Sequence, residues 1–115
     1  YLNTRRTFDR SIGSYQSLKH TMVDILTDLE AARSFLYYAA GVIDTDEGEA
    51  AVRMAKAQSS DNFAYAGDRA IQFHGGFGFT YECDAQLFRR RAFWTANQSG
   101  DAIYHRKRLA TLLLD

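Results

Sequence analysis

The sequence predicts an all-α protein, an up-and-down antiparallel bundle of the four-helix type. Three observations support this fold class. The 115 residues include no proline, a composition that suits long helices because proline interrupts the helical hydrogen-bond ladder. Apolar residues recur alternately four and three positions apart from Leu18 to Ile43. No segment shows the two-residue alternation and β-branched enrichment that are typical of strands.

The first helix is predicted over residues 15–43, with Ser14 as its cap. Residues 8–14 contain Asp9, Gly13 and two serines, and they are expected to form the turn before it. The apolar residues of the helix form one lengthwise seam of period 3.5, which indicates a helix that packs along others. The seam consists of Leu18, Met22, Ile25, Leu29, Ala32, Leu36, Ala39 and Ile43.

A second helix is predicted over residues 47–74. Asp46 and Glu49 have the spacing of a capping box, and His74-Gly75-Gly76 should end the helix because glycine reaches left-handed conformations at low cost. One face is rich in small residues, which permits close approach between helix axes. This face consists of Val52, Ala55, Ser59, Phe63, Ala66, Ala70 and Phe73.

Two shorter helices complete the predicted bundle. Residues 82–93 should form the third, and residues 96–100 are a polar break. The last helix is predicted over 101–114, with Leu109, Leu112 and Leu113 buried. One member of the four-helix bundle could instead come from a preceding part of the protein or from a partner.

Composition excludes several classes of protein. The formal net charge is zero, whereas a nucleic-acid binder normally carries a basic excess. Cys83 is the only cysteine, so no intrachain disulfide is possible, and a reducing compartment such as the cytoplasm is expected. No apolar run approaches the roughly 20 residues that span a bilayer. Because the chain begins at Tyr1 in the middle of a pattern, it is expected to be a fragment of a larger protein.

The segment Gln72–Thr80 carries three glycines within four residues, at Gly75, Gly76 and Gly78. Such a segment lets a backbone approach a ligand and can point its amides at a phosphate. It is neither a P-loop nor a dinucleotide fingerprint, because no lysine follows and no strand precedes it. From the residues alone, a helix end followed by a turn is the favoured interpretation.

Arg5, Arg6 and Gln16 could grip a phosphate ester, but from the residues alone an ordinary solvated arginine pair and an exposed glutamine are the favoured interpretation. The arginine and lysine runs at 89–91 and 106–108 are interpreted as solvated or ion-paired helix faces, since consecutive helical residues point in different directions. The three histidines and Cys83 lie too far apart in sequence for a local metal site.

Together, two motifs resemble the C-terminal domain of acyl-CoA dehydrogenases. Residues Arg5 to Gln16 match the start of that domain, where Arg, two residues, Phe, and then Ile and Gln follow at these spacings. Residues Gln72 to Glu82 match its second hallmark, Gln-x-x-Gly-Gly-x-Gly-Tyr/Phe-Thr-x-Glu. The motifs lie 56 residues apart, and the resemblance covers nearly the whole chain.

The resemblance implies a flavin enzyme of lipid metabolism and β-oxidation that removes α and β hydrogens from an acyl-CoA thioester and passes electrons to an electron-transfer flavoprotein. A whole member also has an N-terminal helical domain and a middle β domain. FAD lies between the subunits of a homo- or hetero-oligomer, a tetramer or dimer. The positions that match contacts to the ADP half of FAD are Arg5, Phe8, Gln16, Gln72, Gly75 and Gly76.

The catalytic base is absent from its usual position. Many members carry a glutamate in the loop before the last helix, where this chain has Ser99. A serine hydroxyl without an adjacent base cannot abstract an α-proton near neutral pH, and Asp101 is the nearest carboxylate. In some branches the base lies on the helix preceding Arg5. A non-catalytic partner subunit and an oxygen-using flavoenzyme remain the alternatives to a dehydrogenase.

Overall fold

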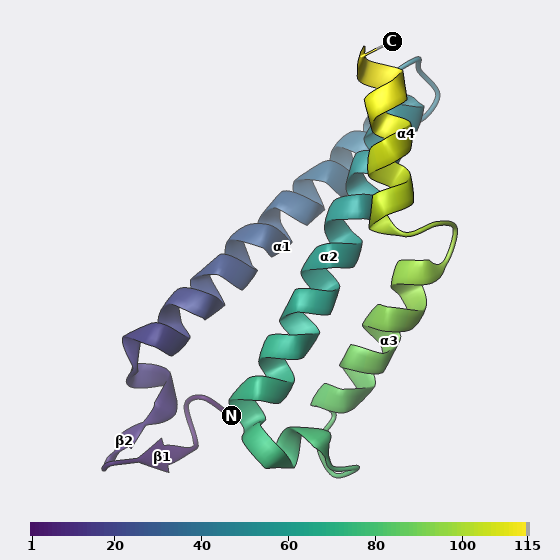
Figure 1. The fold of residues 1–115 in the computed structure, drawn as a ribbon. Helices are drawn as coiled ribbons and strands as arrows, with labels where there is room; N and C mark the ends of the chain where they lie inside the picture. The colour runs from purple at the N-terminus through teal and green to yellow at the C-terminus, as the bar shows by residue number, and fades with distance from the viewer. Residues whose placement is uncertain (115) are drawn as a thin grey trace.

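The computed structural model describes residues 1–114 and contains four α-helices (Figure 1). α1 (Gln16–Val42) and α2 (Gly48–His74) run antiparallel side by side. α3 (Ala85–Asn97) and α4 (Ala102–Leu114) follow one another back along α2, so that α2 contacts each of the other three helices. The predicted all-α antiparallel bundle is confirmed.

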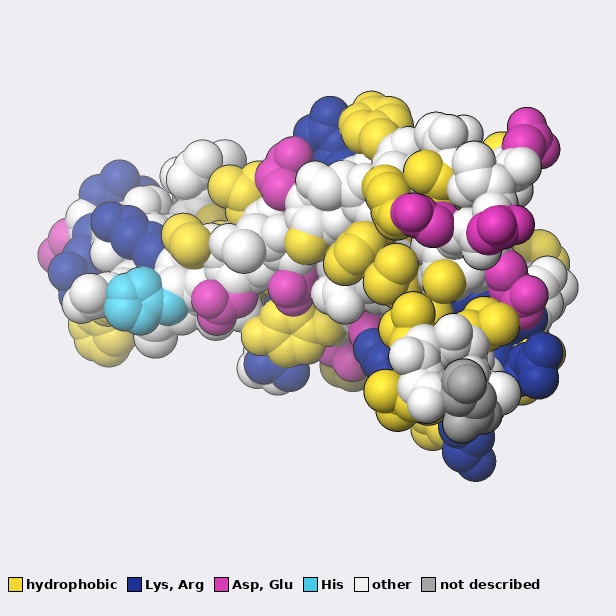
Figure 2. All heavy atoms as spheres, turned by 90° about the horizontal axis from the view of Figure 1, so that it is seen from above, with side chains coloured by type: hydrophobic (Ala, Val, Ile, Leu, Met, Phe, Trp, Pro, Cys, Tyr) yellow, Lys and Arg dark blue, Asp and Glu magenta, His cyan; other side chains and the backbone are white. Residues whose placement is uncertain are grey.

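The domain is elongated, and its interior is made of small side chains. Its radius of gyration is 17.2 Å, against about 13 Å for a compact chain of this length. One buried cluster joins Ala39 to Ala51 and Ala55, and another joins Ile71 to Cys83 and Ala85. Many large apolar side chains are exposed instead, and they appear as scattered yellow patches in Figure 2. None of the helices within residues 1–114 has the length and hydropathy of a membrane span.

Helix positions match the sequence prediction better than helix caps do. The first two helices lie within a residue or so of their predicted bounds, whereas the third begins and ends later than predicted. Both predicted caps are wrong. Ser14 lies in a short 3-10 helix, η1 (Ile12–Ser14), and its hydroxyl donates to the Ser11 carbonyl. The Asp46 cap is absent because α2 begins after Glu47, which makes no side-chain cap hydrogen bond, and Thr45 Oγ1 accepts the Glu47 N–H.

The predicted burial of the apolar residues in α1 and α4 is only partly observed. Ala32 and Ala39 of the α1 seam are buried against α2, whereas Leu29 and Leu36 are more than half exposed. Burial of the last leucines was wrong: Leu113 is 65% exposed, because α4 packs on α2 through Ala102 and His105 near its other end. Within the described chain, nothing covers the remaining apolar faces.

A small β-hairpin precedes α1, where the sequence predicted an undivided turn. β1 (Arg6–Thr7) pairs antiparallel with β2 (Arg10–Ser11). Phe8 and Asp9 form the two-residue connection, with φ of 50° and 61°. Positive φ at both central positions is the geometry of a type I′ turn, which matches the twist of paired strands. Phenylalanine rarely adopts it, so the tip of the hairpin is strained.

Lys56 on α2 fastens the end of α3. Its ammonium group donates to the Thr95 carbonyl at 2.7 Å and to the Ser60 hydroxyl at 3.0 Å. The carbonyls of a last helical turn lack intrahelical partners and carry partial negative charge, so a cation there is doubly favourable. This contact ties the last turn of α3 to α2.

We expect Lys56→Met to lower the free energy of unfolding by about 1–2 kcal/mol, because it removes charge-assisted hydrogen bonds from a half-buried position. Urea unfolding followed by circular dichroism measures the change. Lys107→Met is the matched control, since Lys107 is an exposed lysine on α4. Equal effects of the two substitutions would contradict the capping role.

Candidate cofactor site

A hollow of about 590 Å³ lies beside the C-terminal end of α2 and is bounded by the glycine-rich segment and α3. Three residues predicted to bind a cofactor, Gln72, Gly75 and Gly76, line it together. Arg89 and Phe93 on α3 form the opposite wall. The structure therefore assembles one predicted half of the cofactor site as a single concave surface.

The glycine-rich segment forms a 3-10 helix, η2 (Gly75–Phe79), and not an open loop. Gly75 ends α2 with φ of 62°, and its N–H donates to the Gln72 carbonyl. The helix end followed by a turn, the interpretation favoured from the residues alone, is observed. The Gly75 amide is therefore engaged within the chain and is not directed at a ligand.

The three glycines have different roles. A Cβ at Gly78 would meet the Ile71 carbonyl oxygen at 2.6 Å, so Gly78 allows the turn to pack on α2. A Cβ at Gly76 would meet nothing within 4 Å. Within the described chain nothing requires a glycine at position 76.

The other predicted half of the site lies in and beside the hairpin. Phe8, at its tip, is 92% exposed, and Gln16 is the first residue of α1. The Arg10 guanidinium lies 4.0 Å from the centre of the Tyr15 ring, and its hydrogen bond to the hydroxyl lowers the pKa of Tyr15. Lys and Arg side chains gather at one end of Figure 2, the end where Figure 1 places the hairpin. Arg5 belongs to this basic segment.

The two halves do not line the same hollow. The hairpin lies at the start of α1, on one side of α2, whereas the hollow opens between α2 and α3 on the other side (Figure 1). Arg5, Phe8 and Gln16 are absent from the lining of the hollow. Both halves nevertheless lie near one end of the molecule, where the Tyr1 ring stacks 4.4 Å from that of His74.

The loop before α4 holds Ser99 in a strained conformation, with φ of 60°. The buried imidazole of His105 donates from Nε2 to the Ser99 carbonyl at 3.1 Å. Its Nδ1 lies 3.4 Å from the Arg53 guanidinium and can accept a hydrogen bond from it. Sequence reasoning missed this role of His105, because nothing near it in sequence marks its partners.

Asp101 caps α4. One carboxylate oxygen accepts the Tyr104 N–H at 2.7 Å, and the Asp101 carbonyl accepts the His105 N–H at 3.1 Å. This is the contact of a helix N-cap with its third residue. The carboxylate nearest the usual base position therefore has a structural task.

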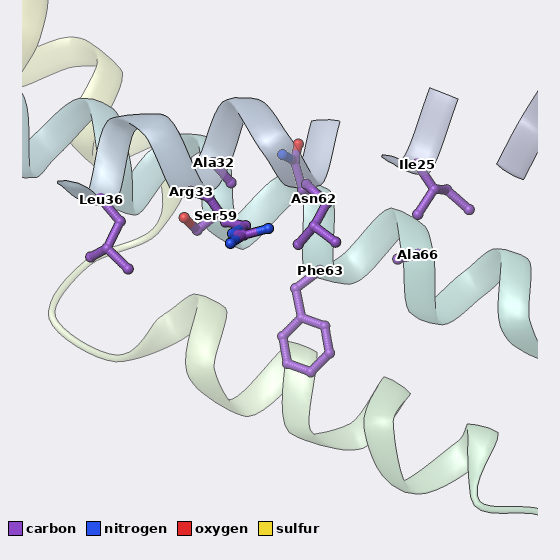
Figure 3. Close-up of a pocket in the computed structure, with 9 residues that line it drawn as sticks. Ile25, Ala32, Arg33, Leu36, Ser59, Asn62, Phe63 and Ala66 are labelled. Atoms are coloured by element: carbon purple, nitrogen blue, oxygen red, sulfur yellow. The ribbon is translucent and has the colours of Figure 1, made fainter. Parts of the chain in front are cut away.

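An apolar groove of about 390 Å³ lies between α1 and α2 (Figure 3). Leu29 and Leu36 line it from α1, and Phe63 and Ala66 line it from α2. Arg33, Ser59 and Asn62 contribute polar groups to its lining, which is otherwise apolar.

Comparison with known proteins identifies the class. The family described as acyl-CoA dehydrogenase, C-terminal domain, matches residues 1–113. The chain belongs to the acyl-CoA dehydrogenase family and corresponds to its C-terminal domain.

Individual relatives agree with this assignment. The chain is 36% identical over 96 residues to acyl-CoA dehydrogenase IpdE2 of Mycobacterium tuberculosis, covering 84% of this chain and 29% of that protein. A solved FAD-dependent dehydrogenase superposes with a TM-score of 0.93 at 31% identity, covering 99% of this chain and 31% of the other. A chain from a structure described as the electron transferring flavoprotein of Acidaminococcus fermentans superposes at 0.91 with 34% identity, covering 100% and 31%. The chain thus spans about three tenths of the length of these relatives.

The glycines provide a first test. We expect Gly78→Ala to lower the free energy of unfolding by about 1–3 kcal/mol, the cost of forcing an added methyl group into a packed site. Gly76→Ala should change it by less than about 0.5 kcal/mol, as at an ordinary surface position. Thermal or urea unfolding of both variants measures the difference. A reversed order would show that the turn is arranged differently.

Asp101 provides a second test. Asp101→Ala should cost about 1 kcal/mol of stability through the lost cap, and Asp101→Asn should restore most of it because asparagine caps equally well. In the full-length protein, turnover by Asp101→Asn should stay within a few-fold of wild type. A loss of about 10⁴ in kcat in a stably folded Asn variant would identify Asp101 as the base instead.

Proposed function

We propose that this chain is the bundle domain of a flavin-dependent acyl-CoA dehydrogenase and that it contributes to FAD sites formed between subunits. The observation that carries the proposal is that the two motifs do not line one hollow. Gln72, Gly75 and Gly76 share the hollow beside α2, whereas Arg5, Phe8 and Gln16 are absent from its lining. Two chains that each present one half to the same dinucleotide would use both.

The residues present fit the ADP half of FAD. The hollow beside α2 is open at Gly76, and Phe79 and Phe93 offer flat apolar surface to a ring. The basic hairpin supplies cations for a diphosphate. When bound, the flavin supplies the hydride acceptor, while the protein binds it and orients it.

The α-proton must be taken by a group outside the Ser99 loop. Ser99 has no carboxylate, and Asp101 is engaged at the start of α4. We propose a base elsewhere in the complete protein, with an acyl-CoA as substrate and an electron-transfer flavoprotein as acceptor in the cytoplasm. The same observation favours a second candidate, a non-catalytic subunit that supports the flavin site of an unlike partner.

The apolar groove between α1 and α2 supports an oligomer. Leu29 and Leu36 lie more than half exposed beside this groove, and such a patch on a helix normally marks a protein interface. We propose that the groove is covered in the assembled protein, in either a homo-oligomer or a hetero-oligomer.

The FAD site is tested in the full-length protein. Arg5→Ala should weaken FAD binding by about 1.5–3 kcal/mol, the scale of a hydrogen bond to a charged group. Gly76→Val should weaken it as well, because the added side chain fills the open wall of the hollow. Flavin content and titration with FAD measure both effects. Arg91→Ala on α3 is the control, since Arg91 is exposed and lines neither the hollow nor the groove between α1 and α2.

Retention of full flavin by both variants at limiting FAD would overturn the proposal. The isolated 115-residue chain should bind FAD weakly or not at all, because half of a site must meet the whole entropic cost of association.

The two candidate functions differ in turnover. If the assembled protein is a dehydrogenase with its base elsewhere, acyl-CoA should reduce a dye through it, and Ser99→Ala should retain turnover within a few-fold. If the chain belongs to a non-catalytic subunit, dye reduction should require an added unlike subunit. Oxygen consumption in place of dye reduction would indicate an oxygen-using flavoenzyme.

A further inference from the structure

The imidazole of His105 connects the loop before α4 to α2. The residue is only 6% exposed and lies in the first turn of α4. Its Nε2 lies 3.1 Å from the Ser99 carbonyl oxygen, and its Nδ1 lies 3.4 Å from Nη1 of Arg53 on α2. We propose that this connection is a pH-dependent device, in which neutral His105 holds the loop and a proton on Nδ1 breaks the connection and frees the loop. This property would hold whether or not the assembled protein binds a flavin.

The two partners of His105 leave it one protonation state. A carbonyl oxygen can only accept a hydrogen bond, so Nε2 must carry the ring hydrogen. A guanidinium group can only donate, so Nδ1 must present its lone pair to Arg53. A proton added to Nδ1 would face a second donor and would place a second positive charge in a buried site. The positive end of the α4 dipole lies at the same turn and opposes that charge as well.

The charged groups on α2 keep Arg53 against the ring. Oε1 of Glu49 accepts from Arg53 Nε at 2.8 Å and from Nη2 at 2.6 Å, and the Arg53 side chain is only 16% exposed. Lys56, one turn further along α2, donates to the Thr95 carbonyl and so adds a cation near the start of the loop. Because two hydrogen bonds hold the guanidinium, a charged His105 ring would have to move away from it.

The groups on α4 and in the loop offer Nδ1 no alternative partner. The Asp101 carboxylate accepts the Tyr104 N–H, and the Tyr104 ring lies edge-on to the imidazole with the ring centres 5.2 Å apart. Arg108, one turn after His105, lies 4.0 Å from Oε1 of Glu49. Within residues 1–114, Arg53 is the only group hydrogen-bonded to Nδ1.

The loop has a strained conformation that depends on this contact. The φ angle is 60° at Ser99 and 99° at Gly100. A serine with positive φ persists only where its surroundings hold it. A Cβ at Gly100 would meet Tyr104 Cδ1 at 2.5 Å and His105 Nε2 at 3.2 Å, so the loop backbone lies directly against both rings. In the described chain no other group donates to the Ser99 carbonyl, so movement of the His105 ring releases the strained residue.

Hydrogen exchange of the full-length protein tests this device. Exchange is compared at about pH 7.5 and about pH 5.5, a range in which histidine titrates while Asp and Glu stay largely ionised. After correction for the intrinsic rate at each pH, exchange of the amides of residues 98–101 should be roughly 10-fold faster at the lower pH, the equivalent of one lost hydrogen bond. The corrected exchange of the α1 amides should not change.

Two variants separate His105 from other titrating groups. In His105→Gln the side-chain amide can donate to Ser99 and accept from Arg53 but does not titrate, so the loop should be equally protected at both pH values. Arg53→Gln should also abolish the pH effect, because an amide can serve as donor to a neutral ring or as acceptor from a charged one. His20→Gln is the matched control, since His20 is an exposed histidine on α1, and it should retain the wild-type effect.

Three results would overturn the proposed device. The first is equal corrected exchange of the wild-type loop at both pH values. The second is persistence of the wild-type pH effect in His105→Gln or in Arg53→Gln. The third is an equal acceleration of the α1 amides at the lower pH, which would indicate general acid unfolding in place of local opening.

Discussion

Close approach to α2 is the constraint on which the rest of the domain depends. This one helix contacts α1, α3 and α4, and its buried positions are nearly all alanine or glycine. Ala51 and Ala55 admit α1, and Gly67 admits the stem of Arg89 from α3. Larger side chains at these positions would push the neighbouring helices outward and separate them from their shared support.

Close packing on α2 also explains why the candidate site lies where it does. At the C-terminal end of α2, Gly78 allows η2 to fold back against Ile71, and this turn leads directly into α3. The hollow is therefore walled by packed elements and not by a free loop. Arg89 in its wall is held by Asp68 and Phe93, so this part of the lining is preorganised.

The parts of the fold that have a local sequence pattern could be predicted. The spacing of apolar residues predicted the long helix α1, and the glycines after His74 predicted the end of α2. The hairpin was not predictable, because Phe8 and Asp9 adopt φ angles that usually call for Asn-Gly. The exposure of Leu113 could not be foreseen either, since an apolar pattern shows that a face is buried somewhere but not whether its partner lies in the same chain.

The residues of the candidate site likewise divide into those that the sequence indicated and those that only the tertiary structure brings there. Gln72 and Gly76 share a motif, so the sequence alone indicated that they belong together. Arg89 stands in a run of three arginines that was interpreted as a solvated face, and only the packing of α3 on Gly67 separates it from its neighbours. Tertiary contacts, which have no short-range signature, also decide that Gly76 lines the hollow and that Arg5 does not.

The buried thiol of Cys83 makes local opening of this chain measurable. Cys83 is 4% exposed and packs with Ile71 and Ala85, at the junction between the glycine-rich turn and α3. An alkylating reagent can reach the sulfur only when that junction opens, so its rate of modification reports local opening there and not the fraying of distant helix ends. A group that bound in the neighbouring hollow and bridged α2 to α3 would slow this reaction without touching the cysteine itself.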